Sequence, residues 1–163
     1  YRQFTDRLFA ITNPQTGKVY GYAFSTWALI DTTSRQPMDL AELPNGGFSS
    51  ALIDKEIPIA GPGRIRLKNT ENAVRTRQAY YTDLDINGHV NSIRYIEMML
   101  DLFPAKQFEA SPVKRLEVAY SAEAYADDLL QFYQEPSAKG DATLVEIRKE
   151  EGRIPVVKAA ITF

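Results

Sequence analysis

The sequence contains no cysteine and only one histidine, His89. Disulfide scaffolds, zinc sites built from thiolates and cysteine nucleophiles are therefore excluded. Long hydrophobic runs are missing as well: no stretch of about 18 apolar residues occurs, so we expect no membrane-spanning helix and no membrane partner. A cysteine-free chain is compatible with a reducing compartment, and we expect a cytoplasmic protein.

The sequence also lacks an excess of basic residues. Its 163 residues include 19 lysines and arginines against 21 acids, which gives a net charge of −2. A nucleic-acid-binding domain typically has a clear basic excess, so we expect no nucleic-acid partner. The rest of the composition is that of an ordinary globular protein, with 44% hydrophobic residues. The length allows one good core or two small packed units.

The N-terminal residues predict a β-hairpin over residues 1–31. Aromatic and β-branched residues are frequent on both sides of Asn13-Pro14-Gln15-Thr16-Gly17, which is a turn signal. From residue 32 to about residue 73, prolines and glycines interrupt the pattern. There we expect only short helical turns, near residues 38–43 and 49–53.

The C-terminal residues predict one helix and several strands. Apolar residues at three- and four-residue spacing run from Val90 to Phe103, and Pro104 ends this helix. An extended segment precedes it. Four strand candidates follow it, at residues 113–124, 127–135, 142–150 and 153–163. A strand, one long helix and an antiparallel meander describe an α+β unit in which a sheet wraps around a single helix.

A weak internal repeat indicates a second copy of this unit. Residues 9–19 and 144–154 share the order strand, polar turn, glycine, basic residue, aliphatic residue, strand. Only the second copy has a helix upstream, so we expect a further segment of the protein before Tyr1. Residues 1–62 are then the C-terminal part of a first domain plus a connector, and residues 63–163 are a second domain. An isolated hairpin is marginal in water and should need that segment or a partner chain.

Polar and titratable residues gather just before the helix. Positions 83–91 hold two carboxylates, two carboxamides and the only histidine. Free N–H groups and the dipole at a helix start suit a reaction that develops an oxyanion. Asp83-x-Asp85-x-Asn87-Gly88 has the opening of an EF-hand loop, but Arg94 stands where the bidentate acid belongs, so we expect no metal site. Turn formation and helix capping are the alternative, favoured for Asp83 and Asn91.

Residues 83–96, Asp-Leu-Asp-Ile-Asn-Gly-His-Val-Asn-Ser-Ile-Arg-Tyr-Ile, resemble the signature of fatty acyl-[acyl carrier protein] (acyl-ACP) thioesterases. In that family, Asp-x-Asn-x-His-Val-Asn-Asn precedes the helix of a hot dog fold, and two such domains follow in tandem. Residues 25–37 resemble the family's segment late in the first domain, so the resemblance covers most of the chain. It implies a tandem hot dog protein of the α+β class whose first copy is incomplete here.

The resemblance also assigns candidate catalytic residues. The family's aspartate, asparagine and histidine correspond to Asp85, Asn87 and His89, and its glutamate corresponds to Glu123. Plant members have a cysteine directly after that glutamate, but this chain has Ala124, so a thiol mechanism is impossible here. Without the family, Glu123 would be interpreted as an exposed acid on an edge strand.

The implied activity is hydrolysis of the thioester of fatty acyl-ACP to release a free fatty acid, a step of fatty acid biosynthesis that needs no cofactor. Glu123, His89 and Asp85 are all candidates for the general base, and we favour attack by water assisted by Glu123. Two alternatives stay open. The chain could belong to an acyl-CoA thioesterase of the hot dog superfamily, or to a domain that binds acyl thioesters without cleaving them.

Other residues are expected to contact the substrate. Asn87, together with backbone amides near Val90 and Asn91, should stabilise the oxyanion. Phe24 and Trp27 are candidates for the lining of an acyl tunnel, although sheet core is their default interpretation.

The implied partner is the acidic acyl carrier protein, which should dock on a basic surface. The basic candidates are Arg64, Arg66, Lys68, Arg75, Arg77 and Arg94, with Lys114 and Arg115 beyond them. An ordinary solvated face is an equally good interpretation of these charges. Hot dog domains resemble halves that pair, so a tandem pair or a homo-oligomer is expected.

Overall fold

The computed structural model describes residues 3–44, 47, 52–53, 56 and 58–163. The chain divides into two compact units, Tyr1–Gly61 and Pro62–Phe163. Each unit is described below by itself. No helix in the described part of the chain is both long enough and apolar enough to span a membrane.

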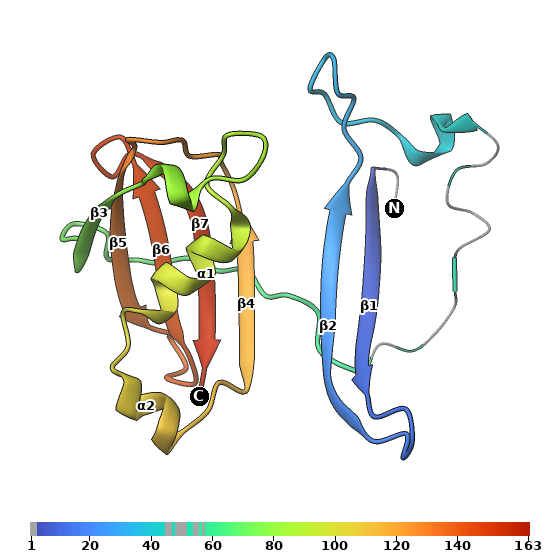
Figure 1. Cartoon of the computed structure of the whole chain (residues 1–163), viewed down its shortest axis with the longest axis horizontal. Coiled ribbons are helices and arrows are strands. Elements are labelled where there is room, and N and C mark those ends of the chain that lie inside the picture. Colours follow the sequence, from blue (N-terminus) through green and yellow to red (C-terminus); the bar gives the residue numbers. More distant parts are fainter. Residues whose placement is uncertain (1–2, 45–46, 48–51, 54–55, 57) are drawn as a thin grey trace. The chain divides into compact units, whose positions relative to one another are not determined.

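The first unit contains the predicted hairpin, formed by β1 (Phe4–Thr12) and β2 (Val19–Ala28) (Figure 1). Its turn is stabilised by Asn13, whose side-chain oxygen accepts hydrogen bonds from two following backbone N–H groups. Gly17 closes the turn with a φ of +69°, a conformation that glycine adopts without strain. A 3₁₀ helix, η1 (Leu40–Glu42), lies within the first predicted helical turn. The second, at residues 49–53, falls largely outside the described residues.

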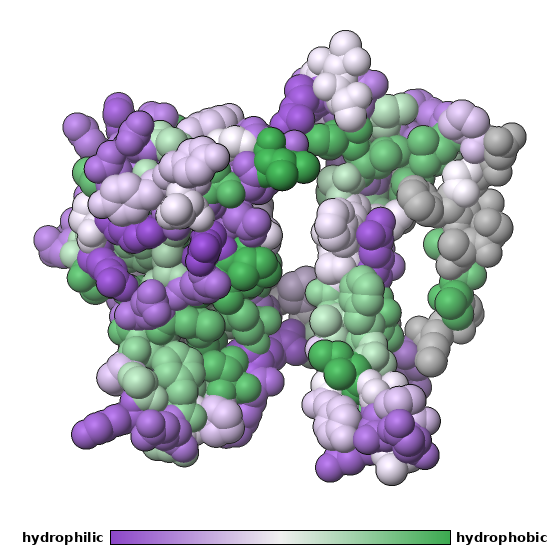
Figure 2. All heavy atoms as spheres, viewed as in Figure 1, coloured by the Kyte–Doolittle hydropathy of each residue, from purple (hydrophilic) through white to green (hydrophobic). Residues whose placement is uncertain are grey.

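The hairpin exposes apolar side chains. Phe9 and Ile11 of β1 are 51% and 64% exposed, and apolar residues are visible on its surface in Figure 2. None of the described residues of this unit is fully buried. A two-stranded sheet with so little burial is not expected to be stable by itself. Its assignment to a first hot dog domain remains a prediction.

The second unit is one antiparallel sheet with a helix against it (Figure 1). The strands are β3 (Arg75–Gln78), β4 (Arg115–Tyr120), β5 (Leu129–Pro136), β6 (Thr143–Lys149) and β7 (Ile154–Thr162), in the order β3-β5-β6-β7-β4. Helix α1 (Ser92–Leu100) lies over one face of the sheet. This wrapped helix is the arrangement of the hot dog fold, and the α+β prediction is confirmed.

The core lies between α1 and the sheet. Tyr95, Met98 and Met99 are the buried residues of α1, at the spacing of one helical face. They pack in a cluster with buried strand residues such as Phe132 and Ile147. Phe132 and Ile147 are directly paired across β5 and β6, so their side chains lie on the same face of the sheet. The alternation of each strand therefore selects which side chains meet the helix.

Residues 62–74, which we call the connector, cross the face of the sheet that lies opposite α1 (Figure 1). It is attached at one end by Glu117 of β4, which accepts a hydrogen bond of 2.7 Å from the Gly63 N–H. At the other end, Glu135 of β5 accepts hydrogen bonds from two consecutive backbone N–H groups, those of residues 68 and 69. Leu67, between these anchors, is buried. This segment is thus fixed to unit 2, and it lies on the C-terminal side of the domain boundary predicted at residue 62.

Two sequence predictions about this unit are wrong in detail. Helix α1 already ends at Leu100, before the predicted end at Phe103, and a short helix, α2 (Ala105–Ala110), begins directly after Pro104, because proline is tolerated at a helix start. β4 ends at Tyr120, so Glu123 lies in the loop after the strand and not on an edge strand. The chain leaves the sheet there because the N–H groups of residues 121 and 122 both bond to the Val156 carbonyl.

Candidate active site

The loop before α1 is a tight turn organised by Asp85. Its backbone N–H donates to the His89 carbonyl at 2.8 Å, and its side-chain Oδ1 accepts from the N–H groups of Asn87 and His89. Gly88 has a φ of +78°, which the turn requires and glycine supplies. The turn therefore depends on the aspartate and the glycine at this spacing, and it fixes the backbone of the only histidine.

Asp85 is held in its ionised form. Partial burial acts to raise the pKa of its carboxyl, but hydrogen bonds from the Asn87 and His89 backbone and from the Asn87 side chain outweigh this, so the pKa lies below its ordinary value. The described contacts of this carboxylate are thus with the loop itself. Its geometry favours a supporting role beneath His89 over direct removal of a proton.

A hydrogen bond between backbones brings the second acid to the histidine. The Val90 N–H donates to the Ala124 carbonyl at 2.8 Å, which joins the loop to the segment after β4. As a result, Nε2 of His89 lies 3.4 Å from Oε2 of Glu123. Both side chains remain partly accessible, 29% exposed for His89 and 44% for Glu123. Residues 34 positions apart in the sequence thereby form one titratable pair beside solvent.

The pair borders a cavity of about 240 Å³. The lining residues are Asp85, His89, Val90, Asn91, Ser92, Tyr95, Tyr120, Ala122 and Glu123. Three of the four candidate catalytic residues are therefore brought together. Asn87 is not among the lining residues. Its side chain is exposed and forms a hydrogen bond with the Asp85 carboxylate.

Two of the backbone amides near which oxyanion donors were expected are engaged within the protein. The Val90 N–H is bonded to Ala124, and the Asn91 N–H donates to the Asp83 carbonyl at 2.8 Å, so neither amide can receive a ligand. The Asn91 side chain caps α1 by accepting from Ile93 N–H, as capping preference indicates. Ser92 also lines the cavity, and its N–H has no partner among the described residues. This first-turn amide is therefore the remaining candidate donor at the helix start.

Three tyrosines surround the pair, and the sequence analysis did not single them out. The Tyr125 hydroxyl donates to Oε2 of Glu123 at 3.1 Å, and the Tyr120 hydroxyl donates to the Ser92 carbonyl at 3.1 Å. Burial raises the pKa of Tyr95 strongly, so its hydroxyl stays protonated. The short spacing of Tyr120, Glu123 and Tyr125 was the available signal, but only the fold shows which groups they reach.

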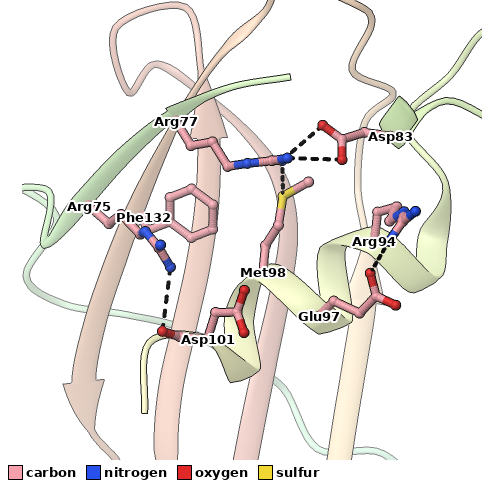
Figure 3. Close-up of a pocket in the computed structure, with 8 residues that line it drawn as sticks. All are labelled: Arg75, Arg77, Asp83, Arg94, Glu97, Met98, Asp101 and Phe132. Atoms are coloured by element: carbon pink, nitrogen blue, oxygen red, sulfur yellow. Dashed lines mark hydrogen bonds and ion pairs between the residues drawn. The ribbon is translucent and has the colours of Figure 1, made fainter. Parts of the chain in front are cut away.

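A second cavity, of about 180 Å³, contains charged residues from β3 and α1 (Figure 3). Arg77 forms a two-pronged ion pair with Asp83, at 2.9 and 3.0 Å. Asp83 also accepts from the Tyr80 N–H, which caps the 3₁₀ turn η4 (Tyr81–Asp83). Burial acts to raise the pKa of Asp83, but these bonds lower it below the ordinary 3.8. Arg94 is paired with Glu97 at 2.6 Å.

The basic docking candidates therefore fall into two groups. Arg77 and Arg94 are paired with acids of unit 2, and Arg75 donates to the Asp101 carbonyl at 3.4 Å. The basic residues of the connector, Arg64, Arg66 and Lys68, are exposed. In the first unit, Phe24 is half-buried on β2, and Trp27 is 54% exposed with the Arg7 guanidinium 4.8 Å from its ring centre. Trp27 is therefore not a core residue of the described hairpin.

Comparison with known proteins identifies relatives of the chain. The sequence profile of the acyl-ACP thioesterase C-terminal domain matches residues 67–163. Dodecanoyl-[acyl-carrier-protein] hydrolase of Cinnamomum camphora is 26% identical over 127 residues, which cover 76% of this chain and 33% of that protein. Palmitoyl-acyl carrier protein thioesterase of Gossypium hirsutum is 24% identical, over 77% of this chain and 31% of that protein. The chain thus spans about a third of the length of these relatives.

Solved structures agree with this match. An acyl-ACP thioesterase from Bacteroides thetaiotaomicron superposes with a TM-score of 0.89 and 40% identity, covering 100% of this chain and 64% of that one. The 12:0-ACP thioesterase of Umbellularia californica has a TM-score of 0.80 at 20% identity, covering 99% and 62%, and supports the fold. On the profile match, which covers more than half of its residues, the chain belongs to the acyl-ACP thioesterase family.

Proposed function

We propose that this protein hydrolyses the thioester of fatty acyl-ACP, with the chemistry at the cavity between His89 and Glu123. The observation that carries the proposal is the 3.4 Å contact between these side chains beside the start of α1. A histidine and a carboxylate within reach of one water molecule form a general acid–base pair. The printed names of the relatives supply the substrate class.

In the proposed reaction, a water molecule in the cavity attacks the thioester carbon while Glu123 accepts its proton. The tetrahedral intermediate then collapses, the carbon–sulfur bond breaks, and the thiolate takes the proton that Glu123 removed from water, either directly or relayed through His89, so that both side chains return to their starting states. No acyl-enzyme forms on a thiol, because the chain has no cysteine. Asp85 keeps His89 in place through the turn described above.

The oxyanion would be stabilised at the helix start. Ser92 lines the cavity, its N–H has no partner among the described residues, and it lies at the positive end of the dipole of α1. Asn87 retains its proposed catalytic role only by turning its amide from Asp85 toward the substrate. Val90 and Asn91 line the cavity and shape the space for the carbonyl.

We propose further that the carrier protein docks on the connector. Arg64, Arg66 and Lys68 are exposed, whereas Ile65 and Leu67 between them are turned inward, an alternation expected of extended chain. Three cations thus follow one another on one side of an anchored segment, which suits an acidic partner. Arg77 and Arg94 are excluded from this proposed surface because their own acids neutralise them.

The central experiment measures thiol release by the complete protein from one acyl group carried either on ACP or on coenzyme A. We expect turnover of both and a higher kcat/KM for acyl-ACP. A clear preference for acyl-CoA would favour the related acyl-CoA thioesterase function. Tight binding of acyl-ACP without thiol release would favour a binding domain instead.

Charge reversal tests the docking surface. Arg66→Glu should raise KM for acyl-ACP several-fold, with little change in kcat or in KM for acyl-CoA, because rim charges act mainly on association. Lys139→Glu, on the turn between β5 and β6, is the matched control with the same change of net charge. An equal effect of the two substitutions would contradict docking at the connector.

A further inference from the structure

Tyr125 contacts both members of the proposed acid–base pair. Its hydroxyl donates to Oε2 of Glu123 at 3.1 Å, the same oxygen that lies 3.4 Å from Nε2 of His89. The edge of one ring faces the other ring in the contact between Tyr125 and His89, with centroids 5.2 Å apart and an interplanar angle of 80°. The Tyr125 side chain therefore contacts both the Glu123 carboxylate and the His89 imidazole.

Tyr125 is itself anchored. Its backbone N–H donates to Oδ2 of Asp128 at 3.0 Å, and the Lys149 ammonium lies 3.4 Å from the same oxygen. That ammonium also lies 5.2 Å from the centre of the Tyr125 ring. The loop is joined to β3 by two backbone hydrogen bonds of 2.9 Å with Ala79. The tyrosine is thus held by contacts with Asp128 and with Lys149 of β6.

We propose that Tyr125 is a positioning residue that fixes the relative geometry of Glu123 and His89. A partly exposed glutamate has several rotamers, and only some of them place its carboxylate beside the imidazole. The hydroxyl selects such a rotamer, and the ring restricts rotation of the imidazole. Tyr125 acts through these two side chains and does not itself contact the reacting atoms. This inference rests on the proposed hydrolase function.

The two contacts can be separated by substitution. Tyr125→Phe removes the hydroxyl and keeps the ring, whereas Tyr125→Leu removes both. If Tyr125 only packed against the loop, the phenylalanine variant would behave as wild type. Tyr81→Phe is the matched control, because Tyr81 is 86% exposed and its hydroxyl has no partner among the described residues.

The kinetic test measures kcat and KM for acyl-ACP in the complete protein, with the melting temperature of each variant. We expect Tyr125→Phe to lower kcat by roughly five- to tenfold, the size expected for losing a partly exposed hydrogen bond to a charged group. KM should change less than about twofold, since the substrate-binding surface is retained. Tyr125→Leu should lower kcat further. Tyr81→Phe should match wild type, and the melting temperature should be unchanged in the phenylalanine variants.

A second readout does not depend on turnover. In protein labelled on its histidine rings, the signal that disappears in His89→Gln identifies the His89 ring by NMR. Tyr125→Leu should shift that signal because the neighbouring ring current is lost, and Tyr125→Phe should shift it much less. An unchanged signal in Tyr125→Leu would overturn the ring contact.

The outcomes separate the two proposals. Absence of thiol release by the wild-type protein would overturn the hydrolase function, and the positioning role with it. Normal hydrolysis by wild type and by Tyr125→Phe alike would overturn the positioning role alone. A loss of kcat that is accompanied by a lower melting temperature would assign Tyr125 to stability instead.

Discussion

The two cavities beside α1 each contain a basic side chain next to a carboxylate, but the two pairs differ in burial. In the arginine-lined cavity, Arg77 and Asp83 satisfy each other, and Asp83 is only 5% exposed (Figure 3). In the other cavity, His89 and Glu123 are partly accessible and lie 3.4 Å apart, and Ser92 of the same lining has an amide without a partner in the described part of the chain. Asp83 and Asp85 stand two positions apart in one loop, yet each belongs to a different cavity.

The difference shows which polar groups are available for chemistry. Charges that complete each other's hydrogen bonds hold the backbone in place and have little capacity left for a ligand. Groups that retain unused capacity beside solvent can bind water and substrate. The arginine-lined cavity thus supports the loop, and we place the reaction in the other cavity, where His89 and Glu123 are accessible to solvent.

Removal of the acid–base pair should give the largest effect. We expect His89→Ala and Glu123→Gln each to lower kcat about a hundredfold or more, the usual contribution of a general acid or base. Both side chains are partly exposed, so unfolding by urea should be nearly unchanged. Near-normal turnover in either variant would remove that residue from the proposed mechanism.

In the arginine-lined cavity, we expect a substitution to lower stability and to change kcat little. Asp83→Asn should reduce the free energy of unfolding by about 2 kcal/mol, less than is typical of a fully buried ion pair because Arg77 keeps part of its hydration. Urea denaturation at pH 7 would measure this. A hundredfold loss of kcat without any loss of stability would contradict the separation of the two cavities.

The same pair predicts a pH dependence. The pKa of Asp83 is lower in the folded protein than its ordinary value of 3.8. The ionised carboxylate therefore contributes its full stabilisation above pH 3.8, and this stabilisation is lost as the pH falls through the pKa of the folded state. The stability difference between wild type and Asp83→Asn should therefore shrink when urea denaturation is repeated below pH 3.8. A difference that is the same at pH 7 and at low pH would exclude the ionised carboxylate as its cause.

The smallest effect should come from the exposed pair on α1. Arg94 and Glu97 are 46% and 52% exposed, and such surface ion pairs contribute little. Glu97→Gln should leave both the denaturation midpoint and kcat within experimental error of wild type. A clear loss of kcat would show that the arginine-lined cavity takes part in the reaction.

Much of the second unit follows from local patterns. The period of the apolar residues predicted α1, and alternation with turn residues predicted β4 to β7 near their observed positions. The motif around His89 predicted the tight turn, because Asp85 and Gly88 have the chemistry that such a turn needs. In the first unit, alternation and the turn around Asn13 predicted the hairpin of β1 and β2.

The candidate site could be predicted less completely. Glu123 was found only through the family resemblance, because an isolated glutamate after a strand is usually a solvated surface residue. The engagement of the Val90 and Asn91 amides could not be foreseen, since their acceptors belong to Ala124 and Asp83. Tyr125 was marked only by its short spacing from Glu123, which does not show that its hydroxyl reaches that carboxylate.

The sequence alone determined the local elements: the helix and its cap, the strands, the turn around Gly88 and the absence of any thiol chemistry. These depend on the residues themselves and on neighbours a few positions away. Only the tertiary structure decided that Glu123 and Tyr125 meet His89, that Arg77 neutralises Asp83, and which helix-start amide stays free. Those outcomes depend on strand register and on hydrogen bonds between distant segments, which no local pattern specifies.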